Sequence, residues 1–300
     1  MTQPLVVSLG EILWDMLPEG KRAGGAPVNF TYHATQNGVA GRSISAIGND
    51  SLGDELEAAV KNSGIEAVLQ RNDYPTGTVG VVLNNGIPSY EIVEGVAWDH
   101  IKISDELINA VKDADAVCFG SLACRNDESR ATILELLKHT KAGAMKYYDI
   151  NIRADYFSKG LIEEQLNAAT VFKFNDDELE LLRPMFDLTG SDEEACKWFI
   201  DNFNLDYVIL TGGSRFSTIM AKNGETSHQR TPRVKVNDTV GAGDSFSGAF
   251  TSEILKGASL HDAHVYACNV AAYVCTQAGA WPQYPDQIPN YIAQQGLSEE

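Results

Sequence analysis

The 300-residue sequence lacks the features of a membrane or disulfide-rich secreted protein. No apolar run approaches the roughly 20 residues that span a bilayer, and the start has too short an apolar run for a signal peptide. The five cysteines include no C-x-x-C pair, and the six histidines show no zinc spacing. We therefore expect a cytoplasmic protein with reduced thiols, and we place His261 and His264 on its surface.

Basic residues are also scarce, with 23 Lys and Arg against 41 Asp and Glu and a net charge of −18. Nucleic acids and anionic membranes attract clustered positive charge, so neither is an expected partner. A nucleotide would have to be bound by local sources of positive charge, such as helix N-termini and a magnesium ion.

Two common nucleotide-binding fingerprints are missing. No G-x-x-x-x-G-K-[ST] motif occurs, which excludes a P-loop enzyme. Gly241, Gly243 and Gly248 are spaced too widely for the G-x-G-x-x-G of a dinucleotide-dependent oxidoreductase. The length allows one large domain with a small appendage.

What the sequence does contain is a glycine turn in front of a helical pattern, within residues 237–250. Gly241 and Gly243 allow a ligand to approach the backbone closely. Apolar residues then recur every four positions until Lys256 and Gly257 end the pattern. The N-terminus of such a helix attracts anions.

Asp244 lies at the start of this predicted helix. An Asp there can simply cap the helix. Capping does not explain the two glycines or the second acid, Asp238. We favour a general base placed beside a bound phosphoryl group.

Short apolar runs alternate with helical patterns along most of the chain, which predicts an α/β fold with a mostly parallel sheet covered by helices on both faces. Ligands gather at the C-terminal ends of such strands. The expected strands are Leu5–Leu9, Ser43–Ile47, Ala116–Phe119, Lys146–Ile150, Val171–Phe174 and Tyr207–Leu210, and the helices include 53–61, 130–139 and 192–203.

Residues 65–98 do not continue this alternation of strands and helices. Thr78–Leu83 and Ser89–Val93 flank Asn84-Asn85-Gly86, which is typical of a β-hairpin. We expect a small β lid formed by about 11–20 and 65–98, which would exclude water from the site.

A second glycine pair opens another helix at residues 24–29. Pro27 suits the first turn of a helix, and the Asn29 amide can both donate hydrogen bonds to sugar hydroxyls and accept them. Asp15, shortly after the first strand, is either a ligand group or a solvated loop acid.

The segment Asp238-Thr-Val-Gly-Ala-Gly-Asp244 resembles the signature of the ribokinase-like (PfkB) carbohydrate kinases. The Gly-Gly-Ala-Pro-x-Asn form of residues 24–29 looks most like the fructokinase group. The resemblance implies one ribokinase-like domain, 1–300, that phosphorylates a sugar hydroxyl with ATP. Asp244 would then be the catalytic base, and the amides of Gly241, Ala242, Gly243 and Asp244 would form the anion hole.

The resemblance also implies binding residues. Asp15, Gly25, Asn29 and Arg153 would bind the sugar, and Asn175, Thr211, Gly213, Gly241 and Gly243 would bind ATP. Arg153 ends an Asp-x-Asn-x-Arg pattern and could equally form a structural salt bridge.

Cations follow from the same resemblance. Glu178, in an Asn-x-x-Glu element that can also serve as a helix cap, would organise Mg²⁺ through water. Asp238 and Gly279 would hold a monovalent cation such as K⁺, although Gln283 replaces the serine of ribokinases.

We therefore expect ATP and a small neutral sugar as ligands, with D-fructose converted to fructose 6-phosphate. A 2-keto-3-deoxygluconate kinase or another PfkB sugar kinase is the alternative, but that sugar acid needs a cation, and residues 74–98 contain no Lys or Arg. A non-catalytic sugar sensor is the alternative of another class. Lids of this family often pair, so the strand around Ile92 and Val93 could form a homodimer.

Overall fold

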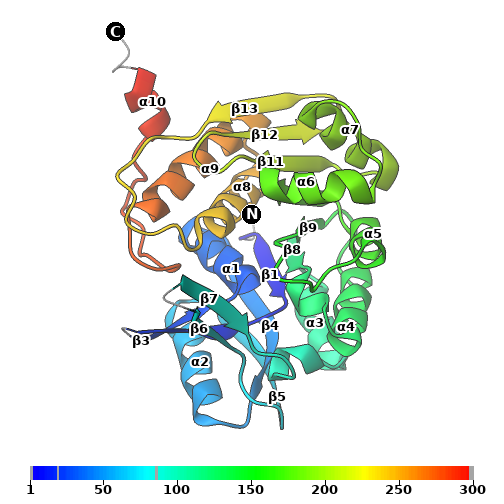
Figure 1. Ribbon diagram of the computed structural model, residues 1–300, viewed down its shortest axis with the longest axis vertical. Helices are drawn as coiled ribbons and strands as arrows, with labels where there is room; N and C mark the ends of the chain where they lie inside the picture. Colours follow the sequence, from blue (N-terminus) through cyan, green and yellow to red (C-terminus); the bar gives the residue numbers. More distant parts are fainter. Residues whose placement is uncertain (1–2, 19, 85–86, 297–300) are drawn as a thin grey trace.

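The computed structural model describes residues 3–18, 20–84 and 87–296, arranged as a large sheet between helices with a small second sheet beside it (Figure 1). The nine-stranded sheet has the order β13-β12-β11-β10-β9-β8-β1-β4-β5. Its strands are β1 Leu5–Leu9, β4 Ala40–Gly48, β5 Glu66–Asn72, β8 Ala116–Gly120, β9 Met145–Asp149, β10 Val171–Asn175, β11 Tyr207–Thr211, β12 Phe216–Ala221 and β13 Thr226–Arg230.

Every neighbouring pair in this sheet is parallel from β5 to β11, while β12 and β13 add an antiparallel edge. The chain begins in β1, fills β4 and β5 on one side, and then crosses to β8 on the other. The strand order therefore reverses between β1 and β8. A crevice forms outside the strand ends at such a point, and ligands of open α/β sheets bind there.

Side-chain alternation along the strands explains why both faces of the sheet are covered. Val6 and Tyr147 enter the core beneath α1, α8 and α9, whereas Val7 and Tyr148 enter the core on the opposite face, with α3 to α7. The helices are α1 Ala26–Gln36, α2 Ser51–Asn62, α3 Asp105–Val111, α4 Asp127–Lys138, α5 Lys159–Ala168, α6 Asp176–Met185, α7 Asp192–Phe203, α8 Ala242–Leu255, α9 Leu260–Cys275 and α10 Tyr291–Gly296.

The small sheet has the order β3-β2-β6-β7, with β2 Leu13–Leu17, β3 Gly20–Gly24, β6 Thr78–Asn84 and β7 Ile87–Ile92. The predicted hairpin is present, although its turn at 85–86 lies outside the described residues. The predicted boundary needs one correction, because 66–72 form β5 at the edge of the large sheet rather than part of the small one. No helix among the described residues is long and apolar enough to cross a membrane.

Close packing of α8 on α1 brings two distant parts of the sequence together. A Cβ at Gly248 of α8 would stand 2.6 Å from the carbonyl oxygen of Phe30 and 3.0 Å from the amide nitrogen of Ala34. Only glycine permits this approach. The contact places the first turn of α8, which carries Asp244, beside the first turn of α1, which carries Asn29.

Candidate active site

The first turn of α8 forms the expected glycine-lined helix N-terminus. Gly241 is the N-cap, with a left-handed φ of 78° that glycine adopts without strain. Asp244 is therefore not the N-cap, and capping does not explain its presence. The Ala242 N–H, predicted as part of the anion hole, donates to the Thr239 carbonyl at 3.2 Å, whereas the N–H groups of Gly241, Gly243 and Asp244 donate to no backbone carbonyl among the described residues.

The Asp244 carboxylate accepts a hydrogen bond from Asn29. Asn29 Nδ2 lies 2.8 Å from Asp244 Oδ2. The other end of the amide, Asn29 Oδ1, accepts from Trp281 Nε1 at 2.7 Å. Asn29 itself is 5% exposed. The catalytic and sugar-binding candidates from opposite ends of the chain are thus in direct contact.

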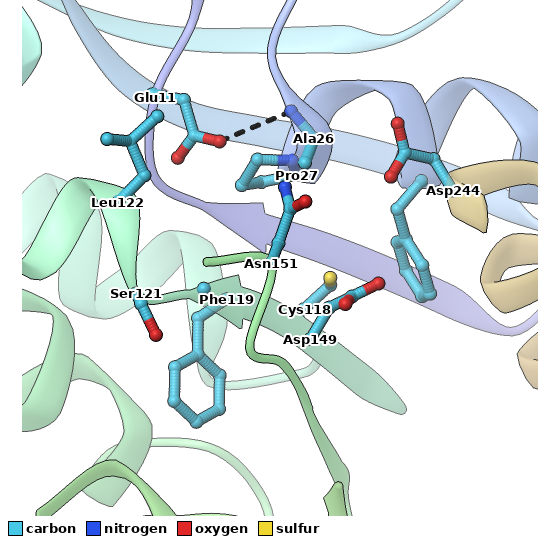
Figure 2. A pocket seen from close by; sticks show the side chains of 12 residues that line it. Glu11, Ala26, Pro27, Cys118, Phe119, Ser121, Leu122, Asp149, Asn151 and Asp244 are labelled. Atoms are coloured by element: carbon cyan, nitrogen blue, oxygen red, sulfur yellow. Dashed lines mark hydrogen bonds between the residues drawn. The ribbon is translucent and has the colours of Figure 1, made fainter. Parts of the chain in front are cut away.

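A small pocket opens beside Asp244 at the point where the strand order reverses (Figure 2). Three carboxylic side chains, those of Glu11, Asp149 and Asp244, line it from different elements. The remaining lining residues are Ala26, Pro27, Phe30, Cys118, Phe119, Gly120, Ser121, Leu122 and Asn151. Carboxylic side chains in a pocket favour neutral hydroxyl groups, with which they form hydrogen bonds, over anions.

A buried ion pair lies behind the glycine turn. Lys173 Nζ of β10 is 2.7 Å from Asp149 Oδ2 at the end of β9, and both side chains are 9% exposed. The same ammonium lies 3.5 Å from the position that a Cβ on Gly243 would take. Ser247 Oγ donates to the Gly243 carbonyl at 2.9 Å and holds the turn from the other side. Lys173 thus places a positive charge behind the glycine turn.

These neighbours set the acidity of Asp244. The pKa of Asp244 is raised to about 6, mainly by burial and also by the negative charge of Asp149. The hydrogen bond from Asn29 opposes both, as do the positive charges of Lys173 and Arg153. A carboxylate with a pKa near 6 is a stronger base than an ordinary Asp and is still ionised at neutral pH.

Glu11 is a second unusual carboxyl group in the pocket, and no sequence motif predicted a role for it. It is 3% exposed. Its Oε1 accepts from the Ala26 N–H at 3.2 Å, and its Oε2 is buried without a hydrogen-bond partner in the described part of the chain. The pKa of Glu11 is raised to about 7, mainly by burial and in smaller part by the nearby charge of Asp244. Glu11 is therefore largely protonated in mildly acidic solution.

We expect Glu11→Gln to remove a pH dependence of stability. The unfolded chain ionises Glu11 near its ordinary pKa of 4.5, but the folded chain does so only near 7. The wild type therefore loses stability as pH rises through this window, by about 3 kcal/mol in total. The glutamine variant does not titrate.

Urea unfolding of both proteins at pH 4.5, 6 and 8 measures the effect. The difference in unfolding free energy, variant minus wild type, should increase by about 3 kcal/mol between pH 4.5 and pH 8. A constant difference across the three pH values would contradict the prediction.

The other predicted sugar-binding residues lie outside the lining of the pocket. Gly25 precedes α1, and a Cβ there would collide with the Glu11 carbonyl oxygen. Asp15 is half-buried on β2 and pairs in register with Arg22 of β3. Arg153 is exposed, and its Nη1 donates to the Ile152 carbonyl at 2.9 Å. None of these three lines the pocket, so their contact with a sugar remains a prediction.

The predicted magnesium element is also a helix cap, as the sequence allowed. Asn175 Oδ1 accepts from the Glu178 N–H, and Glu178 Oε2 accepts from the Asn175 N–H, both at 2.8 Å. Glu178 Oε1 accepts from Ile152 at 2.8 Å. No group of three or more His, Cys, Asp or Glu that could hold a metal occurs among the described residues. A single carboxylate held in this way suits a magnesium contact through water.

The remaining candidates lie at strand ends and in the loop after α9. Thr211 ends β11, and Gly213 follows with a φ of 56°. Asp238 accepts from Gly279 N–H at 3.0 Å and lies 3.4 Å from Arg22 Nη1. Arg22 thus already places positive charge next to Asp238, and K⁺ binding there stays a prediction.

Comparison with known proteins gives one family. The family model described as pfkB family carbohydrate kinase matches residues 19–287. A sugar kinase of Pyrococcus horikoshii is 28% identical over 299 residues, covering 92% of each chain. Its crystal structure matches with a TM-score of 0.78 and 26% identity, covering 92% of this chain and 93% of that one. A further structure of that protein contains ATP.

Two other relatives are named for the sugar that they phosphorylate. An ATP-dependent 6-phosphofructokinase of Thermoanaerobacterium thermosaccharolyticum is 28% identical over 301 residues, covering 94% of this chain and 91% of the relative. A fructokinase of Solanum tuberosum is 27% identical over 313 residues, covering 96% and 94%. The fold prediction is confirmed by these matches, whereas the relatives differ in the sugar that they act on.

Proposed function

The chain belongs to the pfkB family of carbohydrate kinases, and we propose that it transfers the γ-phosphoryl group of ATP to a hydroxyl of a neutral sugar. D-Fructose is the preferred sugar in this proposal, and fructose 6-phosphate is the product. One observation carries this proposal. The Asp244 carboxylate lies at the N-terminus of α8, where it touches Asn29 at 2.8 Å and has a pKa raised to about 6. A proton acceptor and an anion site thus share one helix turn.

In the proposed reaction, Asp244 accepts the proton of the attacking hydroxyl as the oxygen–phosphorus bond forms and the bond to ADP breaks. The free N–H groups of Gly243 and Asp244 and the helix dipole stabilise the negative charge on the phosphoryl oxygens. Lys173, buried beside Gly243 and paired with Asp149, places its ammonium group on the same side. Such fixed charges act strongly because little water surrounds them.

The nucleotide would lie along the ends of β10 and β11, where Asn175, Thr211 and Gly213 are placed. Mg²⁺ bound with ATP would neutralise charge on the phosphates. Glu178 would hold it through water, since both its oxygens already accept backbone N–H groups. K⁺ at Asp238 and Gly279 would be an additional activator.

The sugar would lie over the pocket, against Asn29 and Gly25, with Asp15 and Arg153 at its margin. The small sheet would act as a lid that excludes water, and two copies could pair through β7. The carboxylic side chains of the pocket favour a neutral sugar over a sugar acid such as 2-keto-3-deoxygluconate, whose carboxylate would need a cation such as Arg153 beside it. Several fructokinases among the relatives support fructose.

A coupled assay that follows ADP release from ATP and Mg²⁺ tests the proposal. The panel contains fructose, other neutral hexoses and pentoses, 2-keto-3-deoxygluconate and fructose 6-phosphate. We expect the highest kcat/KM with fructose, and product analysis should give phosphate at the 6-hydroxyl.

Three results would redirect the assignment. A preference for the sugar acid or for fructose 6-phosphate would keep the kinase and replace the substrate. Sugar binding by calorimetry without turnover of any panel member would favour a sensor. No binding of ATP at all would contradict the proposal.

A further inference from the structure

Trp281 makes a contact in the site that no predicted motif includes. It lies in the loop after α9, and its indole Nε1–H donates to Asn29 Oδ1 at 2.7 Å. Asn29 in turn donates to Asp244 at 2.8 Å. The three side chains form one chain of hydrogen bonds, from the indole through the amide to the carboxylate.

The direction of this chain follows from the chemistry of the indole. A Trp N–H can only donate, so the amide must present its oxygen to Trp281. The NH₂ end of Asn29 then faces Asp244. If the amide were reversed, two donors would meet at Trp281 and the amide oxygen would face the carboxylate, leaving both ends unsatisfied. Trp281 therefore selects the only orientation of Asn29 that can donate to Asp244.

Trp281 is itself firmly held. Its ring stacks on Tyr32 of α1, with centroids 5.4 Å apart and planes inclined by 12°. The Tyr32 hydroxyl reaches the backbone carbonyls of Trp281 and Pro282, at 3.1 Å and 3.0 Å. The indole also packs against the cluster that joins Ile12 of the β1–β2 connection to α1 and α2. The donor is thus fixed before any ligand arrives.

We propose that Trp281 is a positioning residue, which fixes the amide of Asn29 so that Asn29 orients and hydrogen-bonds the carboxylate of Asp244. The proposal rests on the proposed function, because it gives Trp281 a role through the general base. It assigns Trp281 no contact with the sugar or the phosphates.

Loss of the indole N–H has a defined electrostatic consequence. The groups that act on Asp244 are Asp149 from β9, which raises its pKa, and Lys173 from β10 and Arg153 from the loop after β9, which lower it. Glu11, after β1, lines the same pocket. The Asn29 hydrogen bond lowers the Asp244 pKa. An amide free to turn gives up part of that bond, so the pKa should rise.

The test is a double-mutant cycle of Trp281→Phe and Asn29→Ala. Phenylalanine keeps an aromatic ring to stack on Tyr32 and removes the indole N–H, at the cost of a smaller ring system. We expect Trp281→Phe to lower kcat about 10-fold, as for loss of a hydrogen bond to a charged group. KM for the sugar should change little, and the acid limb of the kcat profile should move to higher pH. In the Asn29→Ala background, Trp281→Phe should have no further effect.

Trp198→Phe, on the remote helix α7, is the matched control and should leave kcat and its pH profile unchanged. The Asp244 carboxyl should also be titrated by ¹³C NMR, with its signal assigned from Asp244→Asn. This readout needs no turnover, so it separates the inference from the proposed function. An upward movement of the Asp244 pKa in Trp281→Phe supports the inference even if the sugar is not fructose.

Two results would overturn the inference. One is an unchanged Asp244 pKa and kcat in Trp281→Phe. The other is an effect of Trp281→Phe that persists in full when Asn29 is already alanine, because Trp281 would then act on the substrate or on folding rather than through the amide. Inactivity of the wild type towards every sugar would instead count against the proposed function.

Discussion

Asp244→Asn and Asp244→Ala should each lower kcat by at least 10²- to 10⁴-fold, the usual contribution of a general base. The fold should persist, because Asp244 lies in the first turn of α8 after a glycine cap and is not part of either apolar core. Steady-state kinetics with ATP and the best sugar measure the effect, and circular dichroism with urea unfolding checks the fold.

The pH profile gives a second readout of the same residue. Asp244 must be ionised to accept a proton, and its pKa is about 6. We expect the kcat of the wild type to fall about tenfold per pH unit below that value. The residual activity of the alanine variant should lack this acid limb. Near-normal turnover by either variant would refute the role of Asp244.

Lys173→Met should lower the unfolding free energy by about 3–5 kcal/mol, which is the usual effect of removing one partner of a buried ion pair. Asp149, 9% exposed and bonded to Lys173 at 2.7 Å, would be left as an uncompensated buried charge. Urea unfolding measures the loss. Lys146→Met on β9 is a matched control at a half-buried lysine, and it should cost less.

The double variant Lys173→Met, Asp149→Asn separates structure from chemistry. It removes both charges, so much of the stability should return. Activity should not return, because no cation would then stand 3.5 Å from the Gly243 Cβ position. Full recovery of kcat in the double variant would show that Lys173 serves only to balance Asp149.

The parts of the site that the sequence predicted are those that a continuous stretch encodes. The glycine cap, the helix from Ala242 and the capping box of Asn175 and Glu178 all depend on residues within four positions of one another. Local chemistry decides such features, and the structure has all three.

The parts that could not be predicted depend on contacts between distant residues. Asn29 and Asp244 are 215 positions apart, and Asn29 and Trp281 are 252 apart. Lys173 stands between apolar residues of a buried strand, so its charge was the only available signal, and its partner Asp149 lies on another strand. No sequence pattern predicts such contacts between distant residues.

Two errors have similar causes. His264 was expected on the surface because it begins a helix, yet it is fully buried and bonded to Ser217 and Ser227 at 2.7 Å and 2.8 Å. Those serines belong to β12 and β13, an antiparallel pair that was not predicted because polar residues obscure its alternation. Because these two strands were not predicted, the sequence did not show that they cover the start of α9.

The packing of α8 and α9 on α1 has a consequence for synthesis of the protein. The sheet face that carries Val6 and Tyr147 is covered by α1 and also by α8 and α9, which begin only at Ala242 and Leu260, so part of this face lacks its covering helices while the ribosome makes the first 240 or so residues. The nascent chain therefore exposes apolar surface, which favours aggregation with neighbouring chains until the last helices pack on it. Catalytic competence can arise only after release of the last helices from the exit tunnel.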